Sequence, residues 1–209
     1  MNALILVDLQ NDFLPGGALP VPAGDEVVPV ANQLLGQFEV VVATQDWHPA
    51  DHASFAVNHP GKSLGDTIEL NGLPQVLWPI HCVQGTYGAR LVAGLNQAQI
   101  GRIFQKGTDS LLDSYSGFFD NGRKKSTGLG EFLWQEGISG CFIMGLATDY
   151  CVKFTALDAR LFGLSTFLVL DGCRGVQLQA GDVEKAIHEM AGAGVEFVNS
   201  QEIGGKGRL

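Results

Sequence analysis

The stretch Cys141-Phe142-Ile143-Met144-Gly145-Leu146-Ala147-Thr148-Asp149-Tyr150-Cys151 predicts the turn around which the chain is organised. Its first residues are apolar, as in a buried strand, and a helix is expected over Asp149 to Leu161. The sequence therefore predicts a strand that turns through Gly145 into a helix whose first turn carries the Cys151 thiol. The N–H groups and dipole of a helix N-terminus favour an anion, so we expect this thiol to be biased toward thiolate. The alternative is a cysteine that only packs as a small apolar residue.

Apolar segments alternate with helical segments along the rest of the chain. This alternation is typical of an α/β fold, and we expect a three-layer α/β/α arrangement with a mostly parallel sheet of about six strands, in a single domain over 1–209. In contrast, Pro49 to Pro79 has weak periodicity and many turn residues, which predicts a long irregular connection. The expected strands are Ala3–Val7, Glu39–Thr44, Ile100–Gln105, Cys141–Gly145, Ser165–Leu170 and Val195–Val198.

Composition narrows the class of protein. The 209 residues are 45% apolar, which suits a domain with a substantial core, and the net charge of -9 argues against nucleic acid or an anionic membrane as partner. The N-terminus lacks the pattern of a signal peptide and no apolar run approaches the length of a membrane span, so we expect a cytoplasmic protein. Its four cysteines form no CxxC pair and are expected to be reduced. Composition leaves monomer and homo-oligomer both open.

Reactive side chains follow several of the expected strands. Asp8, Lys106 and Cys151 each lie at or just past a strand end, and in a parallel sheet those ends meet at the edge where ligands bind. A carboxylate can remove the thiol proton and a cation can stabilise the thiolate, so these residues combine a base, a cation and a nucleophile. Backbone N–H groups of Ala147 and Cys151 could receive the oxyanion of an attacked carbonyl. The alternative is an Asp–Lys ion pair that only ties two strands together.

A second group of side chains has the chemistry of metal ligands. Asp46 and His48 alternate on extended chain and point the same way, and His81 from a separate loop would complete three ligands with positions left open. Oxygen and nitrogen ligands without sulfur suit zinc, iron or manganese. His52 could be a further ligand, a group that supports the ligands, or a surface residue.

Three aromatic residues, Phe13, Trp78 and Tyr115, lie in the irregular segments that border the same edge. Aromatic residues usually pack in a core, and that is the alternative for Phe13. Their occurrence together in loops beside the expected site indicates a flat ring as the substrate.

At these residues the chain resembles the nicotinamidases, also called pyrazinamidases, of the isochorismatase-like cysteine hydrolase superfamily. The match extends from Asp8 to about Asp171 and its set of motifs is highly specific. The residues that carry it are Val7-Asp8-Leu9-Gln10-Asn11-Asp12-Phe13, Thr44-Gln45-Asp46-Trp47-His48-Pro49, Trp78-Pro79-Ile80-His81-Cys82-Val83, Lys106-Gly107, Tyr115-Ser116-Gly117-Phe118 and Gly145-Leu146-Ala147-Thr148-Asp149-Tyr150-Cys151.

The resemblance implies a role for each of these groups. It implies that nicotinamide is hydrolysed to nicotinate and ammonia through a cysteine thioester, in NAD salvage, with pyrazinamide as a second substrate. It implies one divalent metal, zinc before iron or manganese, that holds the pyridine nitrogen, and a cis peptide before Ala147 that helps to form an oxyanion hole. The implied catalytic triad is Asp8, Lys106 and Cys151, the metal ligands are Asp46, His48 and His81, and the ring-binding wall is Phe13, Trp78 and Tyr115.

Two other functions fit parts of the sequence. A relative with the same triad could act on another small amide, although Asp46, His48 and His81 argue against this. A non-catalytic ligand-binding or thiol-sensing protein on a flavodoxin-like fold is the alternative from another class. Such a protein would give Asp8 and Lys106 no reason to converge on Cys151.

Overall fold

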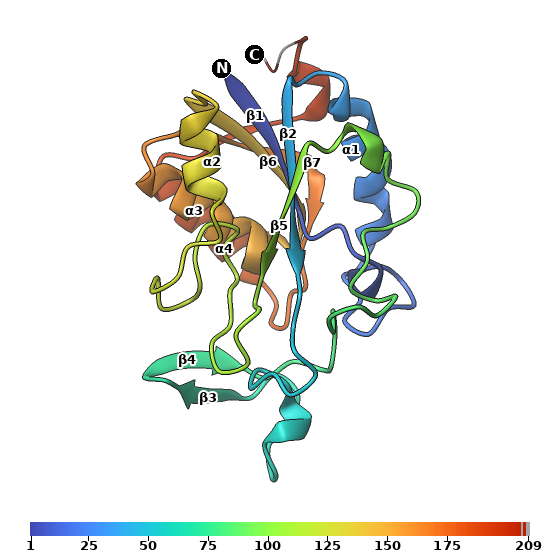
Figure 1. Cartoon of the computed structure of the whole chain (residues 1–209), viewed down its shortest axis with the longest axis vertical. Coiled ribbons are helices and arrows are strands. Elements are labelled where there is room, and N and C mark those ends of the chain that lie inside the picture. The colour runs from blue at the N-terminus through green and yellow to red at the C-terminus, as the bar shows by residue number, and fades with distance from the viewer. Residues whose placement is uncertain (206, 208–209) are drawn as a thin grey trace.

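The computed structural model describes residues 1–205 and 207. Its elements follow one another in the alternating order expected from the sequence (Figure 1). The strands are β1 (Asn2–Val7), β2 (Val40–Asp46), β3 (Thr67–Leu70), β4 (Leu73–Val76), β5 (Arg102–Lys106), β6 (Gly140–Leu146), β7 (Ser165–Arg174) and β8 (Glu196–Val198), and the α-helices are α1 (Val27–Leu35), α2 (Leu129–Gln135), α3 (Lys153–Leu161) and α4 (Asp182–Gly192).

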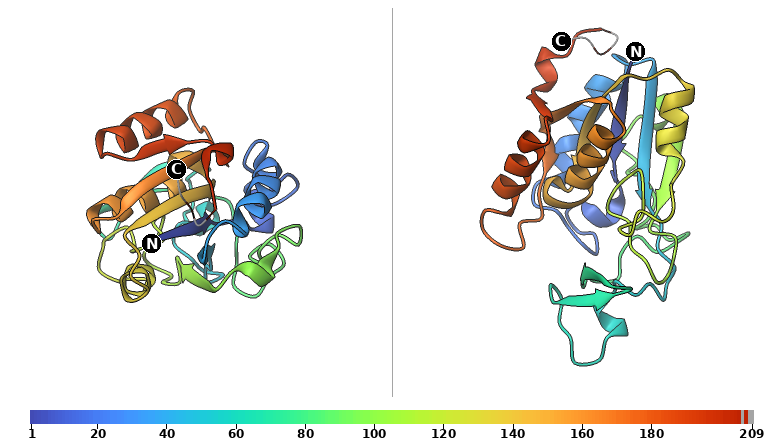
Figure 2. Two further views of the ribbon diagram at one scale, coloured as in Figure 1. Left: turned by 90° about the horizontal axis from the view of Figure 1, so that it is seen from above. Right: turned by 90° about the vertical axis from the view of Figure 1, so that its left-hand side faces the viewer.

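The main sheet has six strands in the order β5-β2-β1-β6-β7-β8, and every neighbouring pair is parallel. Helix α1 lies on one face of this sheet, and α2, α3 and α4 lie on the other (Figures 1 and 2). The predicted three-layer α/β/α fold with a parallel sheet of about six strands is therefore confirmed.

The central strands are covered on both faces, so their sequences are continuously apolar. All seven residues of β6 are buried, and so are the last five of β1. Helix α1 presents a buried stripe to the sheet at Val27, Val28, Ala31, Leu34 and Leu35, the spacing of one helical face.

Because the strands are parallel, their carboxyl ends meet at one edge. Strands β5, β2, β1 and β6 are consecutive neighbours, so the chain delivers Lys106, Asp46, Asp8 and Cys151 to adjacent positions. The register pairs Asp46 directly with Lys106. The fold thus brings together four groups that are far apart in the sequence.

The expectation of an irregular connection from Pro49 to Pro79 is wrong in part. Strands β3 and β4 form an antiparallel hairpin there, which lies at the end of the molecule toward which the sheet strands point (Figure 1). Its turn is Asn71-Gly72, and both residues have positive φ, 54° and 79°. Asn-Gly is the usual pair for such a two-residue turn, so the sequence did contain the signal.

The longest described helix, α4, has 11 residues. In the described part of the chain no helix combines the length and the apolar character needed to cross a bilayer.

Candidate active site

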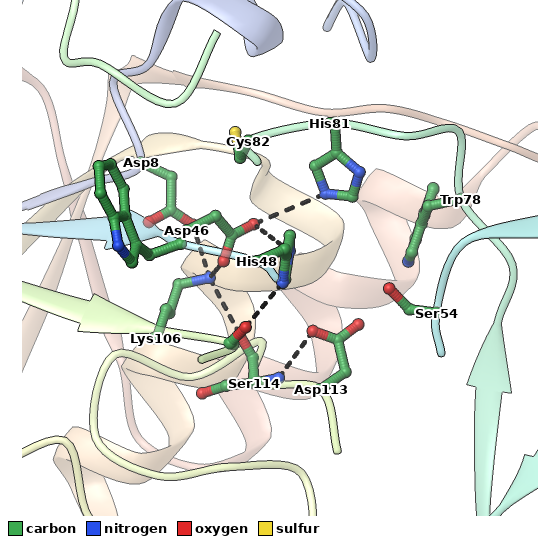
Figure 3. A network of polar contacts seen from close by, with 12 residues as sticks. Asp8, Asp46, His48, Ser54, Trp78, His81, Cys82, Lys106, Asp113 and Ser114 are labelled. Carbon is green, nitrogen blue, oxygen red and sulfur yellow. Dashed lines mark hydrogen bonds and ion pairs between the residues drawn. The ribbon is translucent and has the colours of Figure 1, made fainter. Parts of the chain in front are cut away.

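A buried lysine is the centre of the polar cluster at the carboxyl edge of the sheet. The Nζ atom of Lys106 lies 2.9 Å from Oδ2 of Asp8 and 3.0 Å from the carbonyl oxygen of Ser114 (Figure 3). It also lies 3.3 Å from Sγ of Cys151. It also pairs with Oδ1 of Asp46. The structure therefore brings Asp8, Lys106 and Cys151 together, with Asp46 as a fourth member.

The buried charges of this cluster shift one another's pKa values. Burial opposes the charge on Lys106, but Asp46 and Asp8 raise its pKa well above the usual value, so the lysine remains a cation. Burial raises the pKa of Asp8 against the opposing effect of Lys106, which makes this carboxylate a better base than an exposed aspartate. Asp46 behaves differently: although burial opposes its charge, Lys106 and His48 hold its pKa well below the usual value.

The expectation that Cys151 rests as a thiolate is wrong. Burial raises the pKa of its thiol well above the usual value, Lys106 lowers it, and the carboxylates of Asp8 and Asp46 raise it further. The sequence suggested a helix N-terminus but could not show how deeply the sulfur lies or that two carboxylates face it. A thiol with a raised pKa needs a neighbouring base if it is to act as a nucleophile.

Asp8 is placed to be that base. It follows β1 in a left-handed conformation with φ 51°, which aspartate tolerates better than most residues. Thr44 Oγ1 donates a hydrogen bond of 2.6 Å to Oδ1. Oδ2 is buried and accepts no hydrogen bond, and its partner is the Lys106 ammonium, with which it forms an ion pair. Oδ2 is thus the oxygen with a free lone pair beside the thiol.

The chain around Cys151 is bent tightly after β6. Gly145 has φ 125°, and a side chain there would overlap the backbone of Val7 on β1. The Leu146–Ala147 peptide is cis, as the family resemblance implies. A π-helical turn, Thr148–Val152, carries the cysteine and continues into α3. Ala147 and Cys151 both line the pocket described below.

The three expected metal ligands lie together at the same edge. Oδ2 of Asp46 is 3.5 Å from Nε2 of His48 and 3.8 Å from Nε2 of His81. Nδ1 of His48 bonds to the Gly107 carbonyl at 2.9 Å, and Nδ1 of His81 bonds to the Pro79 carbonyl at 2.8 Å. When each Nδ1 donates to its carbonyl, both Nε2 lone pairs point to the carboxylate, which is the arrangement of a metal-binding set.

His52 is fully buried, so the surface alternative for it is wrong. Its ring lies 4.4 Å from the His48 ring, and its Nδ1 accepts a hydrogen bond of 3.2 Å from the Ser54 N–H. Burial and the neighbouring His48 lower its pKa to about 4. His52 therefore packs against a candidate ligand, and the further-ligand alternative stays open, because His48, His52 and Asp113 form a second possible donor set and Nε2 of His52 has no hydrogen-bond partner among the described residues.

One pocket brings Cys151 and the three candidate metal ligands together with the aromatic residues. Phe13, Trp78 and Tyr115 line it as expected, together with Cys151, Asp46, His48 and His81. The Tyr115 hydroxyl accepts hydrogen bonds from Trp78 Nε1 at 3.2 Å and from Gln75 Nε2 at 3.1 Å, so these aromatic rings hold each other in place. Other residues of the lining are Leu19, Val21, Asp113, Ala147, Tyr150 and Val176. The result is a mostly apolar pocket whose polar lining includes Asp46, His48, His81 and Cys151.

Sequence reasoning missed several residues that hold the site together. Gln10 is buried, and its side chain bonds to both the N–H and the carbonyl of Asp46, each at 2.8 Å. Gln75 reaches the site from the hairpin strand β4 and bonds to Asp113 at 3.0 Å. Gln10 could have been found, because it is a polar residue two positions after Asp8, just past the end of an expected strand. Gln75 could not have been found, because its segment has no periodic pattern from which a position near the site could be predicted.

Comparison with known proteins agrees with this geometry. The family model described as "Isochorismatase domain" matches residues 2–202. The nicotinamidase of Escherichia coli is 52% identical over 92% of each chain. Among solved structures, a nicotinamidase from Acinetobacter baumannii has a TM-score of 0.94 at 46% identity, covering 96% of this chain and 97% of its own. A pyrazinamidase of Pyrococcus horikoshii in complex with zinc has a TM-score of 0.77 at 38% identity, with 95% and 98% covered. The chain therefore belongs to the isochorismatase family.

Proposed function

We propose that this protein is an amidohydrolase that converts nicotinamide and water to nicotinate and ammonia, and pyrazinamide to pyrazinoate, as part of NAD salvage. The observation that carries the proposal is the convergence of Asp8 and Lys106 on Cys151, which lines an aromatic pocket. The high identity to nicotinamidases over almost the whole chain supports the same substrate.

The first half-reaction uses the buried base. Asp8 Oδ2 takes the Cys151 proton while Lys106 stabilises the sulfur anion, and the thiolate attacks the carboxamide carbon. The N–H groups of Ala147 and Cys151 bind the oxyanion of the tetrahedral intermediate. Asp8 returns its proton to the amide nitrogen, the carbon–nitrogen bond breaks, and ammonia leaves a thioester on Cys151.

The second half-reaction reverses these roles with water. Asp8 accepts a proton from a water molecule that attacks the thioester carbonyl, and the same N–H groups bind the second oxyanion. The carbon–sulfur bond then breaks, the proton returns to the sulfur, and nicotinate is released. One amide and one water are consumed for each acid and ammonia formed.

Asp46, His48 and His81 would hold the divalent metal, because their facing oxygen and nitrogen atoms form a suitable donor set. Such a metal supplies a Lewis acid that holds the pyridine nitrogen of the substrate. We propose zinc, since the pyrazinamidase of Pyrococcus horikoshii was solved with that ion, and iron and manganese are the alternatives.

The test is ammonia release from nicotinamide by purified protein whose metal content is measured on the same sample. We expect one metal ion per chain and stoichiometric nicotinate. A protein that contains the metal but hydrolyses another small amide at a much higher kcat/KM would favour the alternative that relatives of this family suggest. Failure to release ammonia from any small amide would overturn the hydrolase proposal.

A further inference from the structure

Asp12, in the segment after β1, belongs neither to the proposed catalytic triad nor to the proposed metal ligands. Asp8, Gln10 and Asp12 alternate along this segment, and the first two act on the thiol and on Asp46. The Asp12 carboxylate does not line the pocket. Its Oδ2 accepts a hydrogen bond of 2.7 Å from the Cys82 N–H, and its Oδ1 accepts one of 3.3 Å from the Ala18 N–H. Asp12 thus ties the loop after β1 to the residue that follows His81.

Cys82 is the point where the chain turns away from the metal ligands. It is fully buried and has φ 47°, an unusual conformation for a residue with a side chain. Its carbonyl accepts the His48 N–H at 3.0 Å, while its own N–H goes to Asp12. The peptide that joins His81 to Cys82 therefore has its N–H fixed by a single carboxylate. Without that carboxylate this buried N–H would lack a partner, and the peptide would rotate to find one.

We propose that Asp12 is a positioning residue for the metal site, which sets the direction of His81 through the Cys82 N–H. The inference rests on the proposed assignment of Asp46, His48 and His81 as ligands. Loss of the Asp12 carboxylate turns the His81 ring away from Asp46 and weakens metal binding. It leaves Asp8, Lys106 and Cys151 in place, because these are positioned by the strands.

Gly88 offers a second way to test the same contact. The Asp12 N–H donates to the Gly88 carbonyl at 3.0 Å, and a methyl group on Gly88 would overlap the Asp12 carboxylate. Gly88 does not have a positive φ, so alanine is compatible with its backbone. Gly88→Ala therefore displaces the carboxylate from the Cys82 N–H without removing it.

The experiment compares zinc affinity in metal-free parent, Asp12→Ala, Gly88→Ala and Asp120→Ala proteins, by competition with a chromogenic chelator. Asp120 is the matched control, because its carboxylate also accepts two loop N–H groups, from Lys124 at 2.8 Å and Lys125 at 3.0 Å, away from the ligands. We expect the zinc Kd to rise by about 10-fold or more in Asp12→Ala and Gly88→Ala, and to stay unchanged in Asp120→Ala. Iodoacetamide should alkylate Cys151 at the parent rate in all metal-free variants, which a general loss of structure would not allow.

A Kd in both Asp12→Ala and Gly88→Ala within about twofold of the parent would overturn the inference, as would equal weakening in the Asp120 control. If Asp12→Ala does not fold, Gly88→Ala decides by the same criterion. A parent protein that binds no zinc would overturn the ligand assignment and this inference with it. Tight zinc binding that is the same in parent and variants would overturn this inference alone and leave the proposed function intact.

Discussion

The thiol half of the site, Asp8, Lys106 and Cys151, and the metal half, Asp46, His48 and His81, are positioned by different means. In the thiol half, Lys106 is the last residue of β5, Asp8 directly follows β1, and Cys151 lies on the π-helical turn after β6. In the metal half only Asp46 lies on a strand, whereas His48 and His81 lie on irregular chain. The thiol half is therefore positioned by strand ends and by the turn that follows β6, whereas the metal half depends on side chains that bind backbone groups.

Asp46 is where the halves meet, because its two carboxylate oxygens face opposite ways. Oδ1 pairs with Lys106, and Oδ2 faces the rings of His48 and His81 (Figure 3). The difference between the halves can thus be tested by disabling one and measuring the other.

Removal of the Cys151 thiol should have the largest effect on the rate of hydrolysis. We expect Cys151→Ala to lower kcat for ammonia release by on the order of 10⁴-fold or more, because Cys151 supplies the thiol that lines the pocket and no other cysteine lines it. The fold, followed by circular dichroism, and the zinc affinity should remain as in the parent. Folded Cys151→Ala protein with near-parent turnover would rule out the thioester mechanism.

The contribution of the metal half to substrate recognition can be measured by changing the substrate instead of the protein. Benzamide has the shape and carboxamide of nicotinamide but no ring nitrogen, so a site built to bind that nitrogen should reject it by up to on the order of 10⁴-fold in kcat/KM. Pyrazinamide keeps a nitrogen at this position and should be a good substrate. If benzamide were hydrolysed within a few-fold of nicotinamide, the metal would not be holding the ring.

In metal-free protein the reactivity of the thiol half can be measured by itself. Iodoacetamide should alkylate Cys151 about 10-fold or more faster than Cys82, Cys141 or Cys173, because only Cys151 lines the pocket beside Lys106. Burial raises the pKa of Cys151 well above its usual value, so the alkylation rate should keep rising with pH beyond the usual pKa of a free cysteine. Mass spectrometry of the labelled peptides gives the four rates, and equal labelling would contradict the arrangement.

The smallest expected effect is on the pH dependence of the base. Thr44 lowers the pKa of Asp8 by its hydrogen bond to the ionised carboxylate, so Thr44→Val should raise that pKa. Asp8 accepts a proton only above its pKa, and the acid limb of kcat/KM should therefore move to higher pH, by about one pH unit. Thr166→Val is the control, since Thr166 is a buried strand residue that bonds to Leu164 instead. An unshifted limb in Thr44→Val would remove Asp8 from the role of base.

The two halves also differ in how far sequence could predict them. Runs of branched residues predicted the strands, and parallel strands deliver their ends to one edge, so Asp8, Lys106 and Cys151 could be expected together. The ionisation state of Cys151 could not be predicted, because it depends on burial depth and on the carboxylates that surround the sulfur.

For the metal half, sequence spacing identified Asp46 and His48 but not what keeps them in place. The bonds from Gln10 to Asp46 and from Asp12 to Cys82 connect segments that are about 35 and 70 residues apart. No local pattern encodes such pairs, since they exist only once the loops are folded over the sheet. The same holds for Gln75, whose hairpin was recognisable from Asn71-Gly72 but whose contact with Tyr115 was not.

The strand order β5-β2-β1-β6 has a consequence for how the activity is acquired during folding. The reactive groups are spread from residue 8 to residue 151, so a nascent or truncated chain that stops before β6 has the base and the lysine but no nucleophile. Contacts between such distant segments form slowly, since long loops must close before they can be made. Recovery of ammonia release after dilution from denaturant therefore reports when the central strands have paired. Activity can thus be used to follow the formation of the sheet.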